Sequence, residues 1–362
     1  MLILVIFHCI LILSVIWALV PFQEKKLSVL VCESKPMEVF CKCGNDCIKS
    51  KSEVLKDFKT IFRACDRCED VKLKKFKPLT EQMDVKLLDS NFKRCTCGRR
   101  HLDVVMAHIL KIMMDEGVKT SDSTLRNVCV PLITPAYPLD TVPYLPDNSL
   151  VILSEDVDGE CANRIVKEVP EVKGVLNGSL SDTVGVKDSG SNPTTYELLD
   201  GCDLRCDIVN TPWGVLCLYK YQGEIHIEVP KPSSPKIEGL KKVLSKFDSP
   251  SVLDCTCGPG TLGLAALLAG APRVVFNDVW YPACQMTILN LEINGFPVTT
   301  TGNDKGLIAT GENFEVYCSD VKDLKDVLSE KFDACLVDVF PGVDDAVFRE
   351  SVDGICREVV VI

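Results

Sequence analysis

The stretch Ser251-Val-Leu-Asp-Cys-Thr-Cys-Gly-Pro-Gly-Thr-Leu-Gly-Leu-Ala-Ala-Leu-Leu-Ala-Gly270 predicts the fold of the C-terminal part of the chain. A short apolar strand ends at Asp254, a bend contains Gly258, Gly260 and Gly263, and an apolar helix follows. This order is typical of a parallel α/β sheet, which brings backbone N–H groups and a helix N-terminus to a nucleotide-like ligand. Glycine is needed where a side chain would forbid the tight turn or block the ligand.

Three further apolar strands are predicted, and each ends in an acid. Their last residues are Asp278, Asp320 and Asp338. Asp278, twenty residues after Gly258, can accept hydrogen bonds from both hydroxyls of a ribose. Because several nucleoside cofactors carry that ribose, Asp278 alone does not identify the ligand.

The spacing around the bend favours one nucleoside over another. Gly258-Pro-Gly-Thr-Leu-Gly263 spells the dinucleotide fingerprint G-x-G-x-x-G, but Asp254-Cys-Thr-Cys lies between the strand and the first glycine. The resulting D-x-x-x-G-x-G resembles the first motif of class I S-adenosylmethionine (SAM) methyltransferases. That resemblance implies an α/β, Rossmann-like sheet over residues 236–362, with Asp320 at the adenine amino group. NAD, and an α/β core that binds no cofactor, are the alternatives.

The segment Asp338-Val-Phe-Pro-Gly342 is the candidate transfer site. It resembles the Asp-Pro-Phe-Gly of tRNA guanine-N2 dimethyltransferases, but with Val inserted and Phe and Pro in reversed order. It also resembles the Asn-x-Pro of guanine-N1 enzymes, with an acid in place of the amide. The resemblance implies that Asp338 accepts a hydrogen bond from the target base, and that Phe340, next to Pro341, stacks on it. The alternative is that Asp338 is an ordinary strand-end residue that lines the cofactor cleft.

A smaller α+β domain is expected over residues 147–230. Its Gly201-Cys-Asp-Leu-Arg-Cys-Asp207 is similar to a stretch before the SAM domain of archaeal and eukaryotic tRNA guanine-N1 methyltransferases. Strands are predicted at 207–221 and 224–229 with a turn at Gln222-Gly223, and residues 297–313 are predicted as a long loop. The sheet then ends at its fifth strand, unless the 207–229 hairpin completes it or the sequence is truncated.

The cysteines before residue 102 predict a metal-binding module at 37–115. Its candidate ligands are Cys41, Cys43, Cys65, Cys68, Cys95 and Cys97, with Cys47 and His101 as further candidates. Zn²⁺ takes four such ligands in a tetrahedron, so one or two structural zinc sites are possible. Reduced structural cysteines and an iron–sulfur cluster are the alternatives. His101 is a ligand or a cap of the following helix.

Charge is unevenly distributed along the chain. Residues 38–101 carry 16 Lys and Arg against 10 Asp and Glu, whereas residues 102–362 carry 21 against 39. A basic module on an acidic body is consistent with RNA docking, for which the resemblance implies tRNA, or with a solvated surface. The basic candidates near the cysteines are Lys72, Lys74, Lys75, Lys77, Lys93, Arg94, Arg99 and Arg100.

The first 22 residues form a hydrophobic leader. Its first twenty are almost entirely apolar, which suits a membrane anchor, and Lys25 and Lys26 would then leave the rest of the chain cytoplasmic. A misassigned start, with Met37 as the true one, is equally consistent. Twenty cysteines in a long chain also favour reduced intracellular thiols over a secreted disulfide framework.

Together these features predict a cytoplasmic SAM-dependent methyltransferase that modifies a base nitrogen of RNA, and the resemblance implies that this RNA is tRNA. Methylation of a protein or small molecule, and a zinc-bearing scaffold without catalysis, are the rival hypotheses.

Overall fold

The computed structural model describes residues 40–186, 193–340 and 343–362. The apolar leader and Pro341 lie outside these residues, so the anchor and the alternative start remain predictions. No helix within the described ranges is long and apolar enough to cross a bilayer. The helices are α2 (Lys51–Asp57), α3 (Leu102–Asp115), α4 (Gly159–Glu168), α5 (Pro235–Leu244), α6 (Thr261–Leu268), α7 (Tyr281–Ile293), α8 (Leu324–Val327) and α9 (Ala346–Ser351).

The strands group into four sheets. Short 3-10 turns occur at Leu79–Glu81, Val85–Leu87, Leu125–Asn127 and Val321–Asp323. The strands are β1 (Arg100–His101), β2 (Val130–Ile133), β3 (Tyr144–Leu145), β4 (Leu150–Ser154), β5 (Val172–Asn177), β6 (Glu197–Gly201), β7 (Leu204–Thr211), β8 (Gly214–Tyr221), β9 (Val252–Asp254), β10 (Val274–Asp278), β11 (Thr299–Thr300), β12 (Gly306–Thr310), β13 (Phe314–Cys318), β14 (Phe332–Val337) and β15 (Cys356–Val361).

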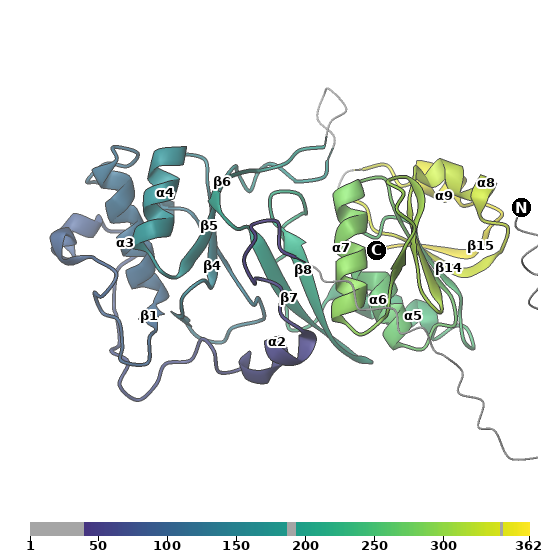
Figure 1. Cartoon of the computed structure of the whole chain (residues 1–362), viewed down its shortest axis with the longest axis horizontal. Coiled ribbons are helices and arrows are strands. Elements are labelled where there is room, and N and C mark those ends of the chain that lie inside the picture. The colour runs from purple at the N-terminus through teal and green to yellow at the C-terminus, as the bar shows by residue number, and fades with distance from the viewer. Residues whose placement is uncertain (1–39, 187–192, 341–342) are drawn as a thin grey trace, which may run out of the picture. The chain divides into compact units, whose positions relative to one another are not determined.

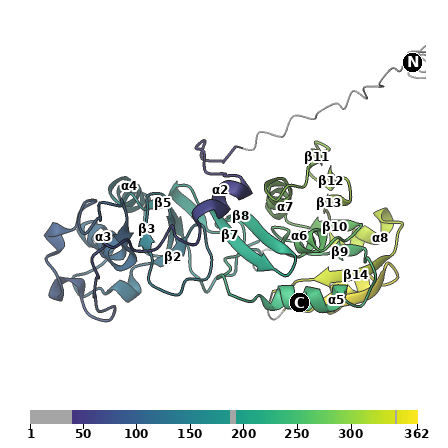
Figure 2. The same ribbon diagram turned by 90° about the horizontal axis from the view of Figure 1, so that it is seen from below.

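The C-terminal sheet has seven strands in the order β11-β12-β13-β10-β9-β14-β15 (Figure 1, Figure 2). The five strands from β13 to β15 are parallel, and β11 and β12 add an antiparallel pair at one edge. The chain runs from β9 to β10 on one side and later returns to β14 on the other. β9 therefore lies where the strand order reverses, which is where open α/β sheets bind ligands.

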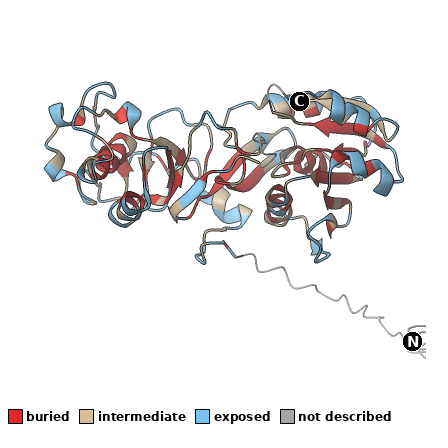
Figure 3. Ribbon diagram, turned by 90° about the horizontal axis from the view of Figure 1, so that it is seen from above, coloured by how far each residue is buried: buried red, intermediate tan, exposed pale blue. Residues whose placement is uncertain are grey.

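Alternating residues of the central strands enter two different cores. Val252, Val274 and Phe276 pack on the side covered by α5 and α6, whereas Leu253 and Val275 pack on the side with α8. Successive strand residues point to opposite faces, and helices cover both faces, so both must be apolar. These strands are accordingly buried along their length (Figure 3).

Several features of this region differ from those predicted from the sequence. Residues 297–313 are not a plain loop, because β11 and β12 form within them and extend the sheet beyond β13. Of the alternatives left open for completing the sheet, the 207–229 hairpin is excluded, because β7 and β8 form a separate two-stranded sheet. The strand predicted at 224–229 was wrong, since these residues form no strand. The predicted turn at Gln222-Gly223 was also wrong. β7 and β8 pair antiparallel from Leu204 with Tyr221 to Thr211 with Gly214, so the turn of the hairpin lies at residues 212–213.

Helix α7 joins the β7–β8 sheet to the glycine bend through two asparagines. The Asn290 amide donates to the Tyr219 carbonyl at 3.0 Å and accepts from the Tyr219 N–H at 2.7 Å. Asn294 pairs in the same way with the N–H and C=O of Cys217. Asn290 also donates to the carbonyl of Pro259 in the bend. The two amides are four residues, or about one helical turn, apart. They replace a neighbouring strand along β8, because they satisfy its backbone N–H and C=O groups.

The N-terminal cysteine-rich segment shares a core with the sheet β2-β4-β5-β6. Residues of α3 pack with strand residues such as Leu150, Ile152 and Val175. Within this core, the Arg100 guanidinium binds the Glu171 carboxylate through both of its oxygens, and both side chains are fully buried. Arg100 was expected on a phosphate-binding surface, and that expectation was wrong because the side chain is committed to this pair.

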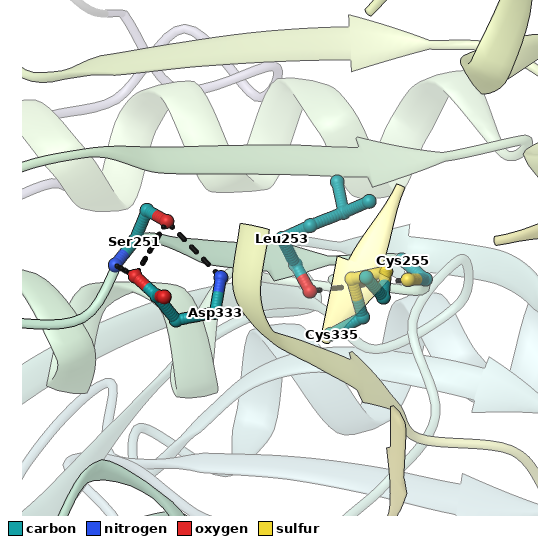
Figure 4. The surroundings of a disulfide bond; sticks show 6 residues. Ser251, Leu253, Cys255, Asp333 and Cys335 are labelled. Carbon is teal, nitrogen blue, oxygen red and sulfur yellow. Dashed lines mark hydrogen bonds between the residues drawn. A yellow bond between two sulfur atoms is a disulfide. The ribbon is translucent and has the colours of Figure 1, made fainter. Parts of the chain in front are cut away.

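One pair of cysteines departs from the expectation of reduced thiols. Cys335 of β14 and Cys356 of β15 form a disulfide, with their Cα atoms 5.9 Å apart (Figure 4). That separation lies within the ordinary range for a disulfide. Beside it, Asp333 accepts hydrogen bonds from the backbone and hydroxyl of Ser251. The other cysteines of the described residues are free thiols.

Candidate functional site

The glycine bend has the left-handed backbone that the sequence predicted. Gly258 has φ +53° and Gly260 has φ +86°, values that residues with a Cβ rarely adopt. A Cβ at Gly258 would meet no atom within 4 Å, so the space above the bend is open. Gly263 has a different role, because a Cβ there would lie 2.2 Å from the Phe276 ring. The third glycine thus allows α6 to pack closely on β10.

Asp254 is buried at the end of β9, directly under the bend. Its side chain is only 1% exposed, and Oδ2 accepts the N–H of Gly263 at 2.9 Å. The other oxygen, Oδ1, has no hydrogen-bond partner. Burial raises the pKa of Asp254 to about 7, although the Gly263 N–H opposes the rise. An acceptor without a partner in a buried place is suited to a hydrogen-bond donor with positive charge.

Asp278 closes the bend from the side of β10. Its Oδ2 accepts the N–H of Gly258 at 2.9 Å, and its Oδ1 accepts the N–H of Trp280 at 2.9 Å. Burial raises the pKa of this carboxyl as well. A carboxylate has about four lone-pair sites, so Asp278 retains capacity for hydroxyl donors. Asp320 follows β13 and is exposed, where its carboxylate caps the next turn at the Lys322 N–H.

Asp338 lies on the opposite side of the bend, directly after β14. The Thr256 hydroxyl bonds to both its backbone N–H and its C=O at 2.9 Å, which ties β14 to the bend. Its carboxylate accepts a hydrogen bond from Lys236 Nζ at 2.6 Å. Burial raises the pKa of Asp338, and Lys236 opposes that rise.

Lys236 was not anticipated from the sequence. It lies at the start of α5 and bridges Asp338 to Glu228, whose carboxylate it contacts at 3.0 Å. Glu228 in turn binds the buried Lys220 of β8 at 2.6 Å. A single lysine in a proline-rich stretch carries no sequence signal for such a bridge, because it depends on α5 lying beside β14.

The aromatic candidate Phe340 packs against the middle region. Its ring lies edge-to-face with His226, with centroids 5.4 Å apart, and a Cβ at Gly185 would meet it at 3.2 Å. His226, predicted at a solvent-facing strand position, is exposed but lies outside any strand, beside the candidate site. Pro341 lies outside the described residues.

Three carboxylates therefore surround the bend. β9 pairs with β10 and β14 on either side, at Phe276 and Leu336 respectively, so Asp278 and Asp338 each extend two residues beyond the level of Asp254. SAM suits these three carboxylates, because its ammonium and sulfonium groups are cationic. Its ammonium group can also donate to Asp254 Oδ1, which has no hydrogen-bond partner. A pyrophosphate fits poorly beside three acids.

Cys65, Cys68, Cys95 and Cys97 form the first cysteine cluster, and their sulfur atoms all lie within 4.8 Å of one another. Neighbouring sulfurs are 3.5 to 3.8 Å apart. Four sulfurs at Zn–S bonds of about 2.3 Å in a tetrahedron are separated by about 3.8 Å, so this cluster can hold zinc. Cys68 N–H donates to the Cys65 carbonyl, and Gly98 N–H to the Cys95 carbonyl, in two tight turns.

Cys41, Cys43 and Cys47 form a second cluster with Cys202, a residue that the sequence reasoning missed. Cys202 lies between β6 and β7, in the Gly201–Asp207 stretch. Cys206 follows it at a ligand-like spacing of four positions, but Cys206 belongs to neither cluster. His101 joins neither cluster. Its Nδ1 accepts the Asp103 N–H at 3.1 Å and caps α3, which decides between its two predicted roles.

The basic side chains near the first cluster differ in availability. Arg99 donates to the Arg63 carbonyl, Arg94 and Lys93 are in ion pairs, and Lys72 and Lys75 lie near acids. Lys74 and Lys77 are exposed, and Phe76 between them is 73% exposed. The Arg126 guanidinium lies over the Phe76 ring, 4.9 Å from its centroid.

No family model and no curated protein matches this sequence. Among solved structures, the fold is similar to the Methanocaldococcus jannaschii tRNA m1G37 methyltransferase, with 16% identity, a TM-score of 0.35 and coverage of 63% of this chain and 57% of that one. A complex of aTrm5 with tRNALeu gives 17%, 0.35, 63% and 58%. Trm1 from Pyrococcus horikoshii with S-adenosyl-L-methionine gives 20%, 0.32, 40% and 38%.

The chain thus spans somewhat over half the length of the first two of these structures. At such identities and TM-scores, the similarity assigns neither an activity nor a substrate to this chain. The site must be judged by its own geometry.

Asp254 makes the stability of the protein depend on pH. Its pKa is raised from an ordinary value near 4 to about 7, so the folded state keeps a proton that the unfolded state has released. Its contribution to stability is therefore complete below pH 4 and is lost as the pH rises to about 7. We predict that Asp254→Asn gains stability relative to wild type across this window, measured by urea unfolding at several pH values.

The matched control for this experiment is Asp304→Asn, whose carboxylate is exposed in the turn between β11 and β12. Its stability difference from wild type should stay flat over the same pH range. A flat difference for Asp254→Asn would contradict a buried, half-partnered carboxylate at this position.

Proposed function

We propose that this chain is a SAM-dependent methyltransferase that transfers a methyl group to a base nitrogen of RNA, with tRNA as the substrate class. The observation that carries the proposal is the convergence of Asp254, Asp278 and Asp338 around a left-handed glycine bend. Such a site attracts a cationic nucleoside and repels a pyrophosphate, which favours SAM over NAD. Lys236, the cation beside the bend, is already paired with two carboxylates.

Each acid has a separate role in this proposal. Asp254 Oδ1, which lacks a partner, receives the amino group of the methionine end. Asp278 accepts the ribose hydroxyls, and exposed Asp320 lies where the adenine amino group is expected. The open space at Gly258 admits the cofactor without a clash. SAM supplies an electrophilic methyl group, so the protein must mainly position the acceptor in line with it.

Asp338 is the proposed proton acceptor for the base nitrogen. Thr256 holds the Asp338 backbone from both sides, which fixes the carboxylate relative to the bend. Lys236 limits the rise in the pKa of Asp338, and so keeps the carboxylate available at neutral pH. Phe340 must leave its edge-to-face contact with His226, or offer its other face, to stack on a base.

RNA is supported as substrate by the surface near the first cysteine cluster. Lys74 and Lys77 can contact phosphates, while Phe76 with Arg126 offers an aromatic face of the kind on which unpaired bases stack. Zinc at Cys65, Cys68, Cys95 and Cys97 would hold this segment in place. The acidic remainder of the chain, with 39 acids against 21 basic residues after residue 101, instead favours a protein or small-molecule substrate.

The test is methyl transfer from SAM labelled on its methyl group to separate fractions of tRNA, protein and small metabolites. We predict labelling of tRNA, and an Asp338→Ala variant that binds SAM but transfers at least about 100-fold more slowly. If only protein or metabolites are labelled, RNA is wrong as the substrate class and the labelled class takes its place. Absence of SAM binding in a calorimetric titration would leave only the scaffold hypothesis.

The same assay distinguishes the proposed RNA surface from net charge. Lys74→Glu with Lys77→Glu should weaken tRNA binding and leave SAM affinity unchanged. Lys241→Glu with Lys242→Glu, on the exposed face of α5, makes the same change in charge and should have little effect. Equal loss in both double variants would contradict a specific RNA surface at Phe76.

Lys236 generates a separate prediction about pH. In Lys236→Met, Asp338 loses its cation, so the pKa of Asp338 rises further and the carboxylate forms only at higher pH. We predict that the acidic limb of the kcat/KM profile moves up by about one pH unit. Lys242→Met, an exposed change on the same helix, should leave the profile in place. An unmoved limb in Lys236→Met would exclude Asp338 as the titrating base.

A further inference from the structure

We propose that Cys41, Cys43, Cys47 and Cys202 bind one structural zinc ion. This ion holds residues 41–58 against the β7–β8 sheet. The proposal is independent of the methyltransferase function, because it concerns only the cysteines and the segment that they hold. It adds a second metal centre to the one at Cys65, with ligands from two distant parts of the chain.

The sulfur geometry suits a tetrahedral metal. Cys41 Sγ lies 3.5 Å from Cys202 Sγ and 3.4 Å from Cys43 Sγ, and Cys43 Sγ lies 3.5 Å from Cys47 Sγ. These separations are much longer than a disulfide of about 2.05 Å. They approach the roughly 3.8 Å edge of a zinc–thiolate tetrahedron. The second cluster thus has nearly the spacing of the first.

Its turn also repeats the turn of the first cluster. Cys41-Lys-Cys-Gly44 has Gly44 at φ +77° with its N–H on the Cys41 carbonyl. Cys95-Thr-Cys-Gly98 has Gly98 at φ +83° with the same hydrogen bond to Cys95. The same Cys-x-Cys-Gly turn therefore presents two thiols in each cluster, and two more cysteines complete each set of four ligands.

Cys202 is held rigidly where it meets this turn. Its N–H donates to the Lys173 carbonyl at 2.7 Å, and a Cβ at Gly174 would lie 2.3 Å from the Cys202 carbonyl oxygen. Gly201 has φ +79°, and a Cβ there would lie 2.2 Å from the Lys173 carbonyl. Two glycines thus let the backbone bring Cys202 against β5, 161 positions after Cys41. Such fixed placement suits a ligand.

Apart from the cysteines themselves, the segment that the cluster holds is attached mainly by partly exposed contacts. Helix α2 has seven residues, none of which is buried, although a capping box at Ser50 and Glu53 defines its start. A helix this short is not stable without tertiary support. The Lys42 N–H donates to the Tyr221 hydroxyl, and the Tyr219 hydroxyl accepts from the Lys49 N–H and donates to the Lys49 carbonyl. Further attachments are the Lys42–Glu224 ion pair, the Phe58–Tyr137 ring contact and partly buried contacts of Ile48, Val54 and Leu55. A metal would supply the missing constraint.

The experiment measures bound metal and local order together in the full chain, purified with zinc present and then passed through a desalting column. Wild type should hold two zinc ions per chain. Cys202→Ser and Cys43→Ser should each hold one, and should lose amide hydrogen-exchange protection over residues 41–58. Cys95→Ser should also hold one ion but keep that protection, because it disrupts the other cluster.

Two further variants separate metal loss from general damage. Cys43→His restores a zinc ligand at a half-buried position and should recover the second ion and the protection, even if Cys202→Ser folds poorly. Cys129→Ser changes a half-buried cysteine outside both clusters and should leave two ions. The proposal is overturned if Cys43→Ser keeps two ions, or loses one while residues 41–58 stay protected.

Discussion

A carboxylate buried with only one of its oxygens satisfied is the constraint on which the site depends. Asp254 ends the central strand of the sheet, where both faces are covered by apolar side chains, so it is shielded from bulk water. The Gly263 N–H satisfies Oδ2, and Oδ1 has no partner. Leaving a buried polar atom unpaired costs about 1–3 kcal/mol. A fold that keeps such an atom beside an open glycine bend is prepared for a ligand that donates to it.

The surrounding elements hold this arrangement from several directions. Asn290 of α7 ties the bend at Pro259 to the backbone of β8, and Thr256 ties it to the residue after β14. Lys236 connects Asp338 to Glu228, and through Glu228 to the buried Lys220 of the hairpin. The β7–β8 sheet is therefore part of the framework of the site, although none of its residues belongs to the glycine motif. A change in the hairpin can reach the bend through these polar links.

The features predicted from the sequence are those that depend on neighbours along the chain. The glycine bend and the strand-end acids follow from local spacing, because parallel strands place their carboxyl ends at one edge. Cys65 and Cys68 carry a ligand spacing that marks them in any context. Lys236 carries no such mark, and the spacing of Cys202 to Cys206 does not reveal its partners at Cys41, Cys43 and Cys47. Each acquires its role only when distant segments meet.

The wrong predictions have the same origin. Arg100 looks like its basic neighbours in the sequence, but the tertiary fold buries it against Glu171, 71 positions away. The strands β11 and β12 lie in a Thr- and Gly-rich stretch of weak strand pattern, and β12 forms because the edge of β13 is free to pair with it. Composition likewise could not predict which cysteines stay reduced. Cys335 and Cys356 form a disulfide because the neighbouring strands β14 and β15 bring them together.

The central claim is that the orphaned Asp254 oxygen receives the amino group of a cationic nucleoside. A crystal structure of the chain with SAM tests it most directly. The account predicts the methionine end over Gly258, with its ammonium group within hydrogen-bond reach, about 2.7–3.2 Å, of Asp254 Oδ1 or joined to it through one water. A cofactor that binds at another surface, or an ammonium group that lies beyond the reach of Asp254 Oδ1, would contradict it.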